Sequence, residues 1–259
     1  MAIKNEIAAV LEKRRGEAVS GQELADMLGV SRAAVWKAVK QLQDEGYHIS
    51  AGRNRGYILG NETDVLSAGG IRLNLPERYR EVPVEVYRTV ESTNNLAKSA
   101  ALGGSAHGTI IAADEQTAGR GRFGKRFYSP SDTGLYMSVI LKPHKPLSDC
   151  FFITAAAACA ITGSIEELCG ITTGIKWVND IFYSGRKICG ILTEAISDFE
   201  SGMTEVVIVG IGVNISTAEF PEEISGVAGS LGVFAERNRL CRQPGVIYLL
   251  GLNQIPVLV

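Results

Sequence analysis

A segment of alternating glycines and cations, Gly119–Arg126, is the part of the sequence with the clearest capacity for chemistry. Its members are Arg120, Arg122, Lys125 and Arg126, interspersed with Gly119, Gly121 and Gly124. Four unpaired cations cannot be buried in a core, and the glycines disfavour a helix. Glycine lets backbone N–H groups approach a ligand closely, and the cations would neutralise an anion. The segment is therefore predicted to be an exposed loop that closes around an anion.

Two polar clusters accompany this loop. Ser92, Thr93 and Asn94 stand at a predicted strand-to-helix junction, where the ordinary interpretation is a helix N-cap. The segment Lys176–Asp180, KWVND, follows a predicted strand and offers a cation for a phosphate, a tryptophan for stacking and oxygens for Mg²⁺. Because Asn–Asp is also typical of turns, a plain turn is the alternative there.

Two further segments contain strand-like residues beside polar or glycine positions. Lys187 precedes the apolar run of GRKICGILTE, residues 185–194, although a lone lysine at a strand start is ordinarily solvated. GIGVN, residues 210–214, ends a predicted strand with glycines that permit close backbone approach. Each segment is unspecific by itself.

In this order and spacing, ESTN, EQTAGRGRFGKR, KWVND, GRKICGILTE and GIGVN resemble the biotin–protein ligase family. With a helix-turn-helix in front, the resemblance is to the bifunctional form, a biotin operon repressor that is also a biotin–[acetyl-CoA-carboxylase] ligase. It covers about residues 1–241. The family more often has proline where this chain has Val178, and a β-branched residue is expected to continue a strand there.

The resemblance implies a two-step reaction with biotin, ATP and Mg²⁺. Biotin and ATP give biotinyl-5′-AMP, from which biotin passes to a lysine of the biotin carboxyl carrier protein. Lys187 and Arg122 are implied as the catalytic residues. The implied biotin-binding residues are Ser92, Thr93, Asn94, Gln116, Arg120, Gly121, Arg122, Lys187 and Gly190. Arg120, Arg122, Lys176, Asn179 and Asn214 would bind ATP and the adenylate, and Asp180 would bind Mg²⁺.

Two alternatives stay open. One is a biotin-sensing repressor with impaired or no ligase activity. The other is a different acyl-adenylate enzyme or a lipoyl or octanoyl transferase that shares the fold. The glycine–arginine loop and the lack of a plausibly placed catalytic cysteine argue against it. The five cysteines are odd in number and contain no C-x-x-C pair, so neither a disulfide framework nor a zinc knuckle is indicated. Buried free thiols are expected.

Residues 1–62 are predicted to form a winged helix-turn-helix. Ser20 and Glu23 form a capping-box pattern, Gly29 ends that helix, and Ser31 begins the next one. Strands over Tyr47–Ser50 and Gly56–Leu59 would form the wing. Within the helix-turn-helix Gly21–Lys40, DNA contacts are expected from Ser31, Arg32 and Lys37, with Arg53 and Arg55 on the wing. Protein docking is the alternative use. The expected partners are operator DNA and a second copy, because a dimer would bind two half-sites.

The remainder is predicted to be α+β with a mixed sheet, and the resemblance implies a catalytic domain like that of class II aminoacyl-tRNA synthetases. A linker spans residues 63–82, with a short helix beginning within Asp64–Ser67 and an irregular stretch over residues 73–83. The catalytic domain spans residues 83–241, in which LYMSVILK is expected to alternate as a half-buried strand. Residues 242–259 are an atypical tail in place of an SH3-like domain, interpreted as a truncated or frame-shifted end, with a genuine variant tail as the alternative.

Composition limits the class of protein. The chain has 259 residues, of which 46% are hydrophobic and 21% charged, as in a globular protein. The net charge of −2 means that any DNA-binding surface must be local. The charged N-terminus is unlike a signal peptide, and the apolar run of residues 246–259 is interrupted by polar residues and too short to span a bilayer. A cytoplasmic protein without membrane association is expected.

Overall fold

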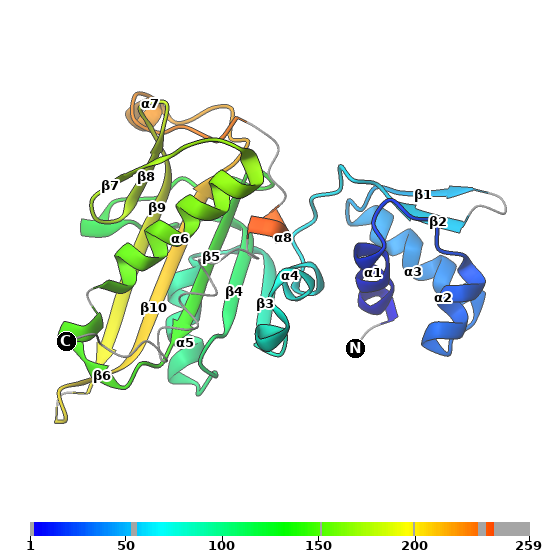
Figure 1. The fold of residues 1–259 in the computed structure, drawn as a ribbon, viewed down its shortest axis with the longest axis horizontal. Coiled ribbons are helices and arrows are strands. Elements are labelled where there is room, and N and C mark those ends of the chain that lie inside the picture. Colours follow the sequence, from blue (N-terminus) through cyan, green and yellow to red (C-terminus); the bar gives the residue numbers. More distant parts are fainter. Residues whose placement is uncertain (1–2, 53–55, 151, 199, 233–236, 241–259) are drawn as a thin grey trace. The chain divides into compact units, whose positions relative to one another are not determined.

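A computed structural model describes residues 3–52, 56–150, 152–198, 200–232 and 237–240 of the chain (Figure 1). It divides into two compact units, Met1–Asn74 and Leu75–Val259. The predicted wing arginines Arg53 and Arg55 lie outside the described residues, as does the predicted tail, 242–259.

The first unit is a helical module with a two-stranded wing. Helices α1 (Ile3–Lys13), α2 (Gly21–Leu28) and α3 (Arg32–Asp44) precede the antiparallel strands β1 (Ile49–Gly52) and β2 (Gly56–Leu59), and α4 (Ala68–Asn74) closes the unit. Its core contains the fully buried side chains Ile7, Leu11, Leu24, Leu42 and Leu59.

The local signals for the helix ends are confirmed. Ser20 Oγ accepts a hydrogen bond from Glu23 N at 3.0 Å, and Ser31 Oγ accepts one from Ala34 N at 3.2 Å. Gly29 ends α2 with φ +64°, a left-handed conformation that glycine adopts without strain. These residues set the helix-turn-helix geometry.

The connector differs from its prediction. The helix expected within Asp64–Ser67 begins instead at Ala68, because Ser67 Oγ accepts from Gly70 N at 3.0 Å and so precedes the first turn. The stretch expected to be irregular contains the end of α4 and a short 3-10 helix, η1 (Glu77–Tyr79).

The second unit is built on one mixed sheet. The strand order is β3-β4-β5-β10-β9-β8-β7, and β6 also pairs with β10. β3 (Val84–Val90) runs parallel to β4 (Ile110–Gln116), and the other pairings are antiparallel. The remaining strands are β5 (Gly134–Leu141), β6 (Lys145–Pro146), β7 (Gly174–Lys176), β8 (Asp180–Tyr183), β9 (Arg186–Ser197) and β10 (Met203–Asn214). The mixed sheet confirms the α+β prediction.

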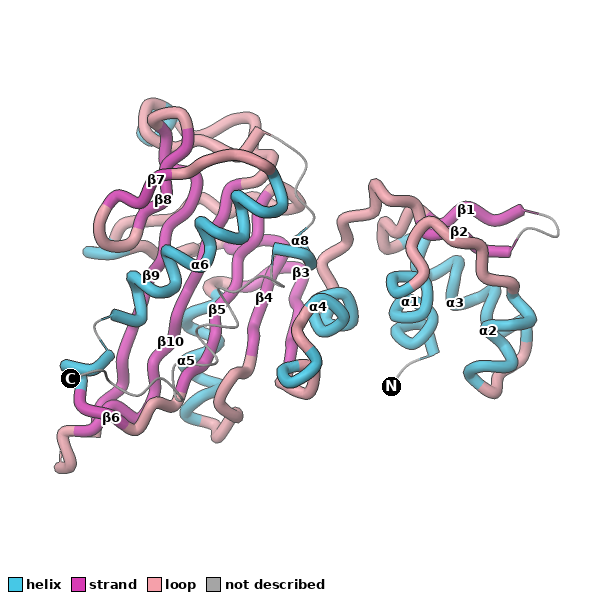
Figure 2. Tube along the Cα trace, in the orientation of Figure 1, coloured by secondary structure: helices cyan, strands magenta, loops and turns pink. Residues whose placement is uncertain are grey.

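Two helices cover opposite faces of this sheet (Figures 1 and 2). Helix α5 (Thr93–Leu102) buries Ala97 and Ala101 against Ile111, Ile140 and Ile208. Helix α6 (Phe152–Cys169) lies on the other face. The shorter elements are η2 (Arg122–Gly124), η3 (Leu147–Cys150), α7 (Glu222–Ser225) and α8 (Arg237–Leu240).

Strand β5 corrects one expectation. LYMSVILK was expected to be half buried, but all residues of β5 are buried. The strand lies between β4 and β10, and the sheet is covered on both faces. A central strand of this kind has no solvent-facing side, so its sequence need not alternate.

Helix α6 is, within the described ranges, the one helix long and apolar enough to cross a membrane by length and composition. Its buried positions include Ile153, Ala157 and Ile161, and Thr154 Oγ1 donates to Thr193 Oγ1 of β9 at 2.8 Å. The apolar character of α6 thus fits a helix that packs on a sheet.

Candidate active site

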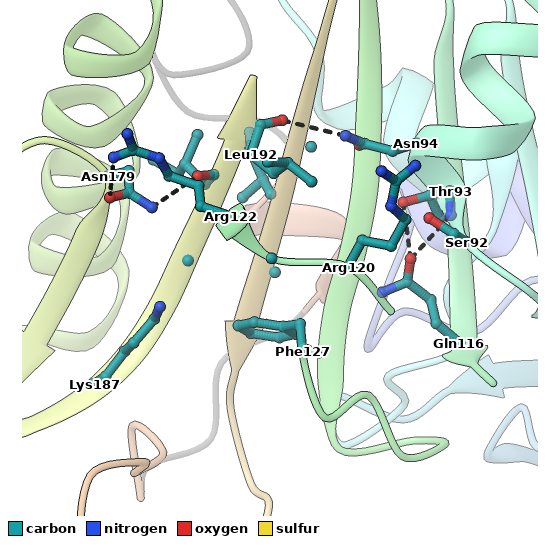
Figure 3. A pocket seen from close by; sticks show the side chains of 16 residues that line it. Ser92, Thr93, Asn94, Gln116, Arg120, Arg122, Phe127, Asn179, Lys187 and Leu192 are labelled. Atoms are coloured by element: carbon teal, nitrogen blue, oxygen red, sulfur yellow. Dashed lines mark hydrogen bonds between the residues drawn. The ribbon is translucent and has the colours of Figure 1, made fainter. Parts of the chain in front are cut away.

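Two adjoining cavities lie beside the glycine–arginine loop. The first is an open pocket of about 460 Å³, a volume that includes space open to solvent. Figure 3 shows the side chains that line it. It is lined by all nine residues predicted to bind biotin, namely Ser92, Thr93, Asn94, Gln116, Arg120, Gly121, Arg122, Lys187 and Gly190. Segments that are distant in the sequence therefore converge on one pocket.

The first turn of α5 supplies the polar wall of this pocket. Thr93 is buried, and both its backbone N, at 2.9 Å, and its hydroxyl, at 3.1 Å, donate to Gln116 Oε1. Ser92 occupies the N-cap position but makes no capping hydrogen bond, so the plain N-cap interpretation does not account for it.

Asn94 is held within the protein. Its amide nitrogen donates to Leu192 O at 3.2 Å and to Glu194 Oε2 at 2.8 Å, and its Oδ1 accepts from Ser138 Oγ at 2.7 Å. Gly210 lies on β10, and a Cβ at this position would stand 2.0 Å from Asn94 Oδ1. Only glycine at position 210 therefore leaves room for the Asn94 amide. Because both amide hydrogens of Asn94 are bonded within the protein, its role is to fix the geometry of the polar wall of the pocket.

The glycine–arginine segment Gly119–Arg126 and the following Phe127, here together called the hairpin loop, fold back on themselves. Gly121 N donates to Lys125 O at 2.7 Å, and Phe127 N donates to Gly119 O at 2.9 Å. Phe123 at its tip is 88% exposed with φ +55°. The predicted exposed loop is confirmed, and its ends are held in register.

Phe127 was not singled out in the sequence, yet it lines both cavities. A Cβ on Gly212 would stand 2.5 Å from Phe127 Cε1, and one on Gly190 would stand 3.1 Å from Cε2. Two glycines on neighbouring strands thus make the space that the ring occupies (Figure 3). The GIGVN glycines were expected to allow a close approach, but their occupant could not be read from the motif.

The second cavity continues from the first and has a volume of about 1320 Å³, which includes space open to solvent. It is lined by five of the six residues predicted to bind ATP or Mg²⁺, namely Arg122, Lys176, Asn179, Asp180 and Asn214. The sixth, Arg120, lines only the first cavity. The two cavities share Gly121, Arg122, Phe127, Asn179 and Lys187. Arg122 and Lys187, the two predicted catalytic cations, therefore lie at the boundary.

Both boundary cations are held by neighbouring polar groups. Lys187 Nζ lies 2.7 Å from Asp180 Oδ1, so Lys187 is not the solvated lysine of the alternative interpretation. Arg122 Nη1 donates to Asn179 Oδ1 at 3.3 Å, and Asn179 Nδ2 donates to Ile191 O at 3.1 Å. Polar groups of the β7–β8 turn and of β8 thus orient the cations.

A segment after β10, including Val227 and Ala228, lines one side of the second cavity. Lys187 N donates to Val227 O at 2.8 Å, and Gly229 N donates to Lys187 O at 2.9 Å. Asn214 Nδ2 donates to Gly229 O at 3.0 Å. Asn214 thus fixes this segment beside the start of β9.

The KWVND motif is only partly as expected. Trp177, proposed as a stacking surface, is 77% exposed and lines neither cavity. Val178 was expected to continue a strand, but it lies in the turn between β7 and β8. The turn interpretation is correct for the backbone, while the side chains of Lys176, Asn179 and Asp180 still reach the second cavity.

Among the described cysteines, Cys189 directly precedes Gly190, which lines the first cavity. Cys189 on β9 is fully buried, and burial raises the pKa of its thiol to about 12. Since the thiolate is the nucleophilic form, Cys189 is not equipped for covalent catalysis. No cluster of three or more His, Cys, Asp or Glu side chains among the described residues could hold a metal ion.

On the helix-turn-helix of the first unit, the predicted contact residues Ser31, Arg32 and Lys37 are all exposed. The opposite side of α3 is buried through Val35, Ala38, Val39 and Leu42. The structure thus presents these polar residues on the free face of the expected recognition helix.

The chain is similar to known proteins over both units. The model of the Biotin/lipoate A/B protein ligase family matches residues 86–214, and an HTH domain model matches residues 4–58. The bifunctional ligase/repressor BirA of Bacillus subtilis is 37% identical over 229 residues, covering 88% of this chain and 70% of that protein. A biotin–[acetyl-CoA-carboxylase] ligase of Mycobacterium tuberculosis is 34% identical over 166 residues, covering 61% and 59%.

Solved structures agree with these matches. Biotin protein ligase from Aquifex aeolicus in complex with biotin and ATP superimposes with a TM-score of 0.54 at 29% identity. The match covers 66% of this chain and 69% of that one.

Proposed function

The chain belongs to the family of biotin–protein ligases that carry an N-terminal helix-turn-helix, and from this we propose that it is both a ligase and a repressor. As a ligase it forms biotinyl-5′-AMP from biotin and ATP. It then transfers the biotinyl group to a lysine of a biotin carboxyl carrier domain. As a repressor it binds operator DNA of biotin genes when it holds the adenylate.

The observation that carries the ligase proposal is the shared boundary of the two cavities. A small, polar-walled cavity meets a larger one that contains Lys176, Asn179 and Asn214, and Arg122 and Lys187 line both. We assign biotin to the first cavity and ATP to the second. The biotin carboxylate and the α-phosphate then meet beside two cations.

In the first step a biotin carboxylate oxygen forms a bond to the α-phosphorus. The bond from that phosphorus to the bridging oxygen breaks, and pyrophosphate leaves with its electron pair. Lys187 and Arg122 stabilise the negative charge that develops around the phosphorus. Their contacts to Asp180 and Asn179 hold them in place beforehand, so little reorganisation is needed.

Ser92, Thr93 and Gln116 are assigned to the ureido ring of biotin. Thr93 and Gln116 are already oriented by their mutual hydrogen bonds, and Gln116 Nε2 also donates to Ser129 Oγ at 2.9 Å. Polar groups fixed in this way reject analogues that lack a matching donor or acceptor, because a buried group is then left unpaired.

In the second step the amine of the carrier lysine attacks the acyl carbon of the adenylate. The carbon–oxygen bond to phosphate breaks, AMP leaves with the electron pair, and the new amide nitrogen loses a proton. The hairpin loop, through Arg120, Gly121 and Arg122, covers the adenylate and excludes water that would hydrolyse it. No covalent enzyme intermediate is required.

Asp180 fits a limited role toward Mg²⁺. It is a single carboxylate on the wall of the second cavity, and Mg²⁺ in nucleotide sites commonly takes one or two carboxylates, with phosphate oxygens and water as its other ligands. When bound, the ion would neutralise phosphate charge.

The repressor half of the proposal uses the exposed face of α3, with Arg32 and Lys37, in the major groove. Adenylate binding would favour a homodimer that carries two such helices onto a palindromic operator. This coupling is reciprocal, so operator DNA would also favour adenylate retention. From these two proposed activities we infer a cytoplasmic location.

One experiment tests the proposal. The protein is incubated with labelled biotin, MgATP and a carrier domain, and bound adenylate and labelled carrier are measured separately. We expect both. Adenylate without labelled carrier would indicate a sensor without ligase activity, and the absence of both would contradict the proposal.

A further inference from the structure

Glu194 on β9 has a distinct partner for each carboxylate oxygen. Oε2 accepts from Asn94 Nδ2 at 2.8 Å, and Oε1 lies 3.5 Å from Arg120 Nη2. The side chain is 26% exposed. Beyond Ile191, no described strand pairs with β9 on the side opposite β10, so Glu194 lies at a free edge of the sheet. A partly buried carboxylate at an edge is costly unless paired, and these two contacts provide the pairing.

The contacts of Glu194 lead to both ends of the hairpin loop. On one side Arg120, at the start of the loop, is also held by Asn95, to whose Oδ1 it donates at 2.7 Å. Glu194 therefore acts together with the first turn of α5 in holding this end.

The other contact leads through Asn94 to the far end of the loop. Asn94 is joined through Ser138 to Thr93, which lies 2.9 Å from Ser138 Oγ. From there the chain of contacts runs to Gln116, to Ser129, and to the backbone oxygen of Phe127, which accepts from Ser129 Oγ at 3.1 Å. The carboxylate of Glu194 is thus linked by hydrogen bonds both to the polar wall of the first cavity and to the hairpin loop.

We propose that Glu194 is a positioning residue that fixes Asn94 and Arg120 in one arrangement and holds the hairpin loop against α5. The carboxylate only accepts hydrogen bonds, so it sets Asn94 with its nitrogen toward Glu194 and its oxygen toward Ser138. It also attracts the Arg120 guanidinium by charge. Glu194 lines neither cavity, so its influence on the ligand passes through these two residues. The part of the inference that concerns the adenylate rests on the proposed function.

The first arm of the test needs no ligand. The hairpin loop contains four trypsin sites, after Arg120, Arg122, Lys125 and Arg126. Loop cleavage by trypsin is followed by mass spectrometry in the wild type, in Glu194→Gln, and in the control Glu205→Gln, which changes an exposed glutamate of β10. Glu194→Gln keeps the size of the side chain and removes its charge. We expect up to about fivefold faster loop cleavage than in the control, as for the loss of one partly exposed ion pair, with an unchanged melting temperature. Equal cleavage in the two variants would overturn the proposal.

The second arm measures release of the bound adenylate. We expect Glu194→Gln to release biotinyl-AMP up to about fivefold faster, while the rate of adenylate formation stays within about twofold. Glu194→Asp, which keeps the charge, is expected to restore part of the difference. Because Glu194 acts through Arg120, adding Glu194→Gln to Arg120→Ala is expected to cause less further loss than in the wild type. Full additivity would contradict the positioning role. A wild type that forms no adenylate would refute the proposed function, and the ligand-free arm would still decide the role of Glu194.

Discussion

Lys187 Nζ lies 2.7 Å from Asp180 Oδ1, across the neighbouring antiparallel strands β9 and β8. This ion pair stands where the two cavities meet, because Lys187 lines both and Asp180 lines the larger. A cation at this boundary can act on both reacting anions. The carboxylate keeps the ammonium directed there before either anion binds.

Lys187→Ala is expected to reduce adenylate formation by at least about 100-fold, since one electrostatic group aimed at a developing charge commonly contributes that much. Pyrophosphate release gives the rate, and thermal unfolding shows that the fold is kept. Lys98→Ala, at an exposed position on α5, is the matched control. Near-normal pyrophosphate release from Lys187→Ala would remove Lys187 from the catalytic role.

The variant Asp180→Asn tests whether Asp180 binds Mg²⁺ or only orients Lys187. If Asp180 contributes a ligand to Mg²⁺, the variant needs about tenfold more Mg²⁺ for half-maximal adenylate formation, a loss in the range seen when support of a metal site is weakened. The measurement is pyrophosphate release against Mg²⁺ concentration at saturating ATP. A lower rate with an unchanged Mg²⁺ requirement would leave Asp180 only the task of orienting Lys187.

Gly212→Ala tests the space made for Phe127. The conformation of Gly212 does not require glycine, so the effect comes from the added Cβ, which would stand 2.5 Å from Phe127 Cε1. Overpacking of this kind costs about 1–3 kcal/mol, and we expect the displaced ring to weaken biotin binding about tenfold, measured by calorimetry.

Gly163→Ala is the control for that substitution. A Cβ at Gly163, on α6, meets no atom within 4 Å, so the change is expected to be neutral or to stabilise the helix by up to about 1 kcal/mol. Biotin affinity in Gly212→Ala equal to that of this control would show that the ring position is unimportant.

A structural role could be predicted from the sequence where the interacting residues are close together along the chain, and not where they are far apart. Ser20, Gly29 and Ser31 act on residues at most four positions away, so their roles could be predicted from the sequence. The place of Phe127 depends on Gly190 and Gly212, and that of Glu194 on Asn94 and Arg120. These partners are remote along the chain, and no local pattern marks them.

The resemblance of the ordered motifs anticipated which segments meet, but not how each side chain is used. Trp177 has the residue type for stacking but lies in a turn and points to solvent, because β7 ends one residue earlier. The burial of β5 likewise depends on its neighbours in the sheet. Tertiary arrangement therefore decided both cases.

Cys189→Ala tests whether acyl transfer passes through a thiol. The pKa of about 12 keeps this buried thiol protonated at physiological pH. We expect carrier biotinylation within about twofold of the wild type and a loss of roughly 1 kcal/mol in the free energy of unfolding for the small cavity. Loss of transfer with intact adenylate formation would instead show that the acyl group passes through this thiol.

Lys37→Ala tests the helix-turn-helix as a DNA-binding surface. Lys37 is exposed on α3, opposite the buried positions Val35 and Val39. If it contacts a phosphate, its loss weakens binding to all sequences similarly and lowers the slope of log affinity against log salt by about one. Fluorescence anisotropy of the adenylate-loaded protein with a labelled duplex selected from random DNA gives affinity and slope together.

Lys13→Ala, which removes an exposed lysine of α1, should leave the slope unchanged. An unaltered slope in Lys37→Ala would indicate that Lys37 does not contact the DNA backbone. A loss of affinity confined to the selected sequence would indicate that Lys37 contacts a base instead.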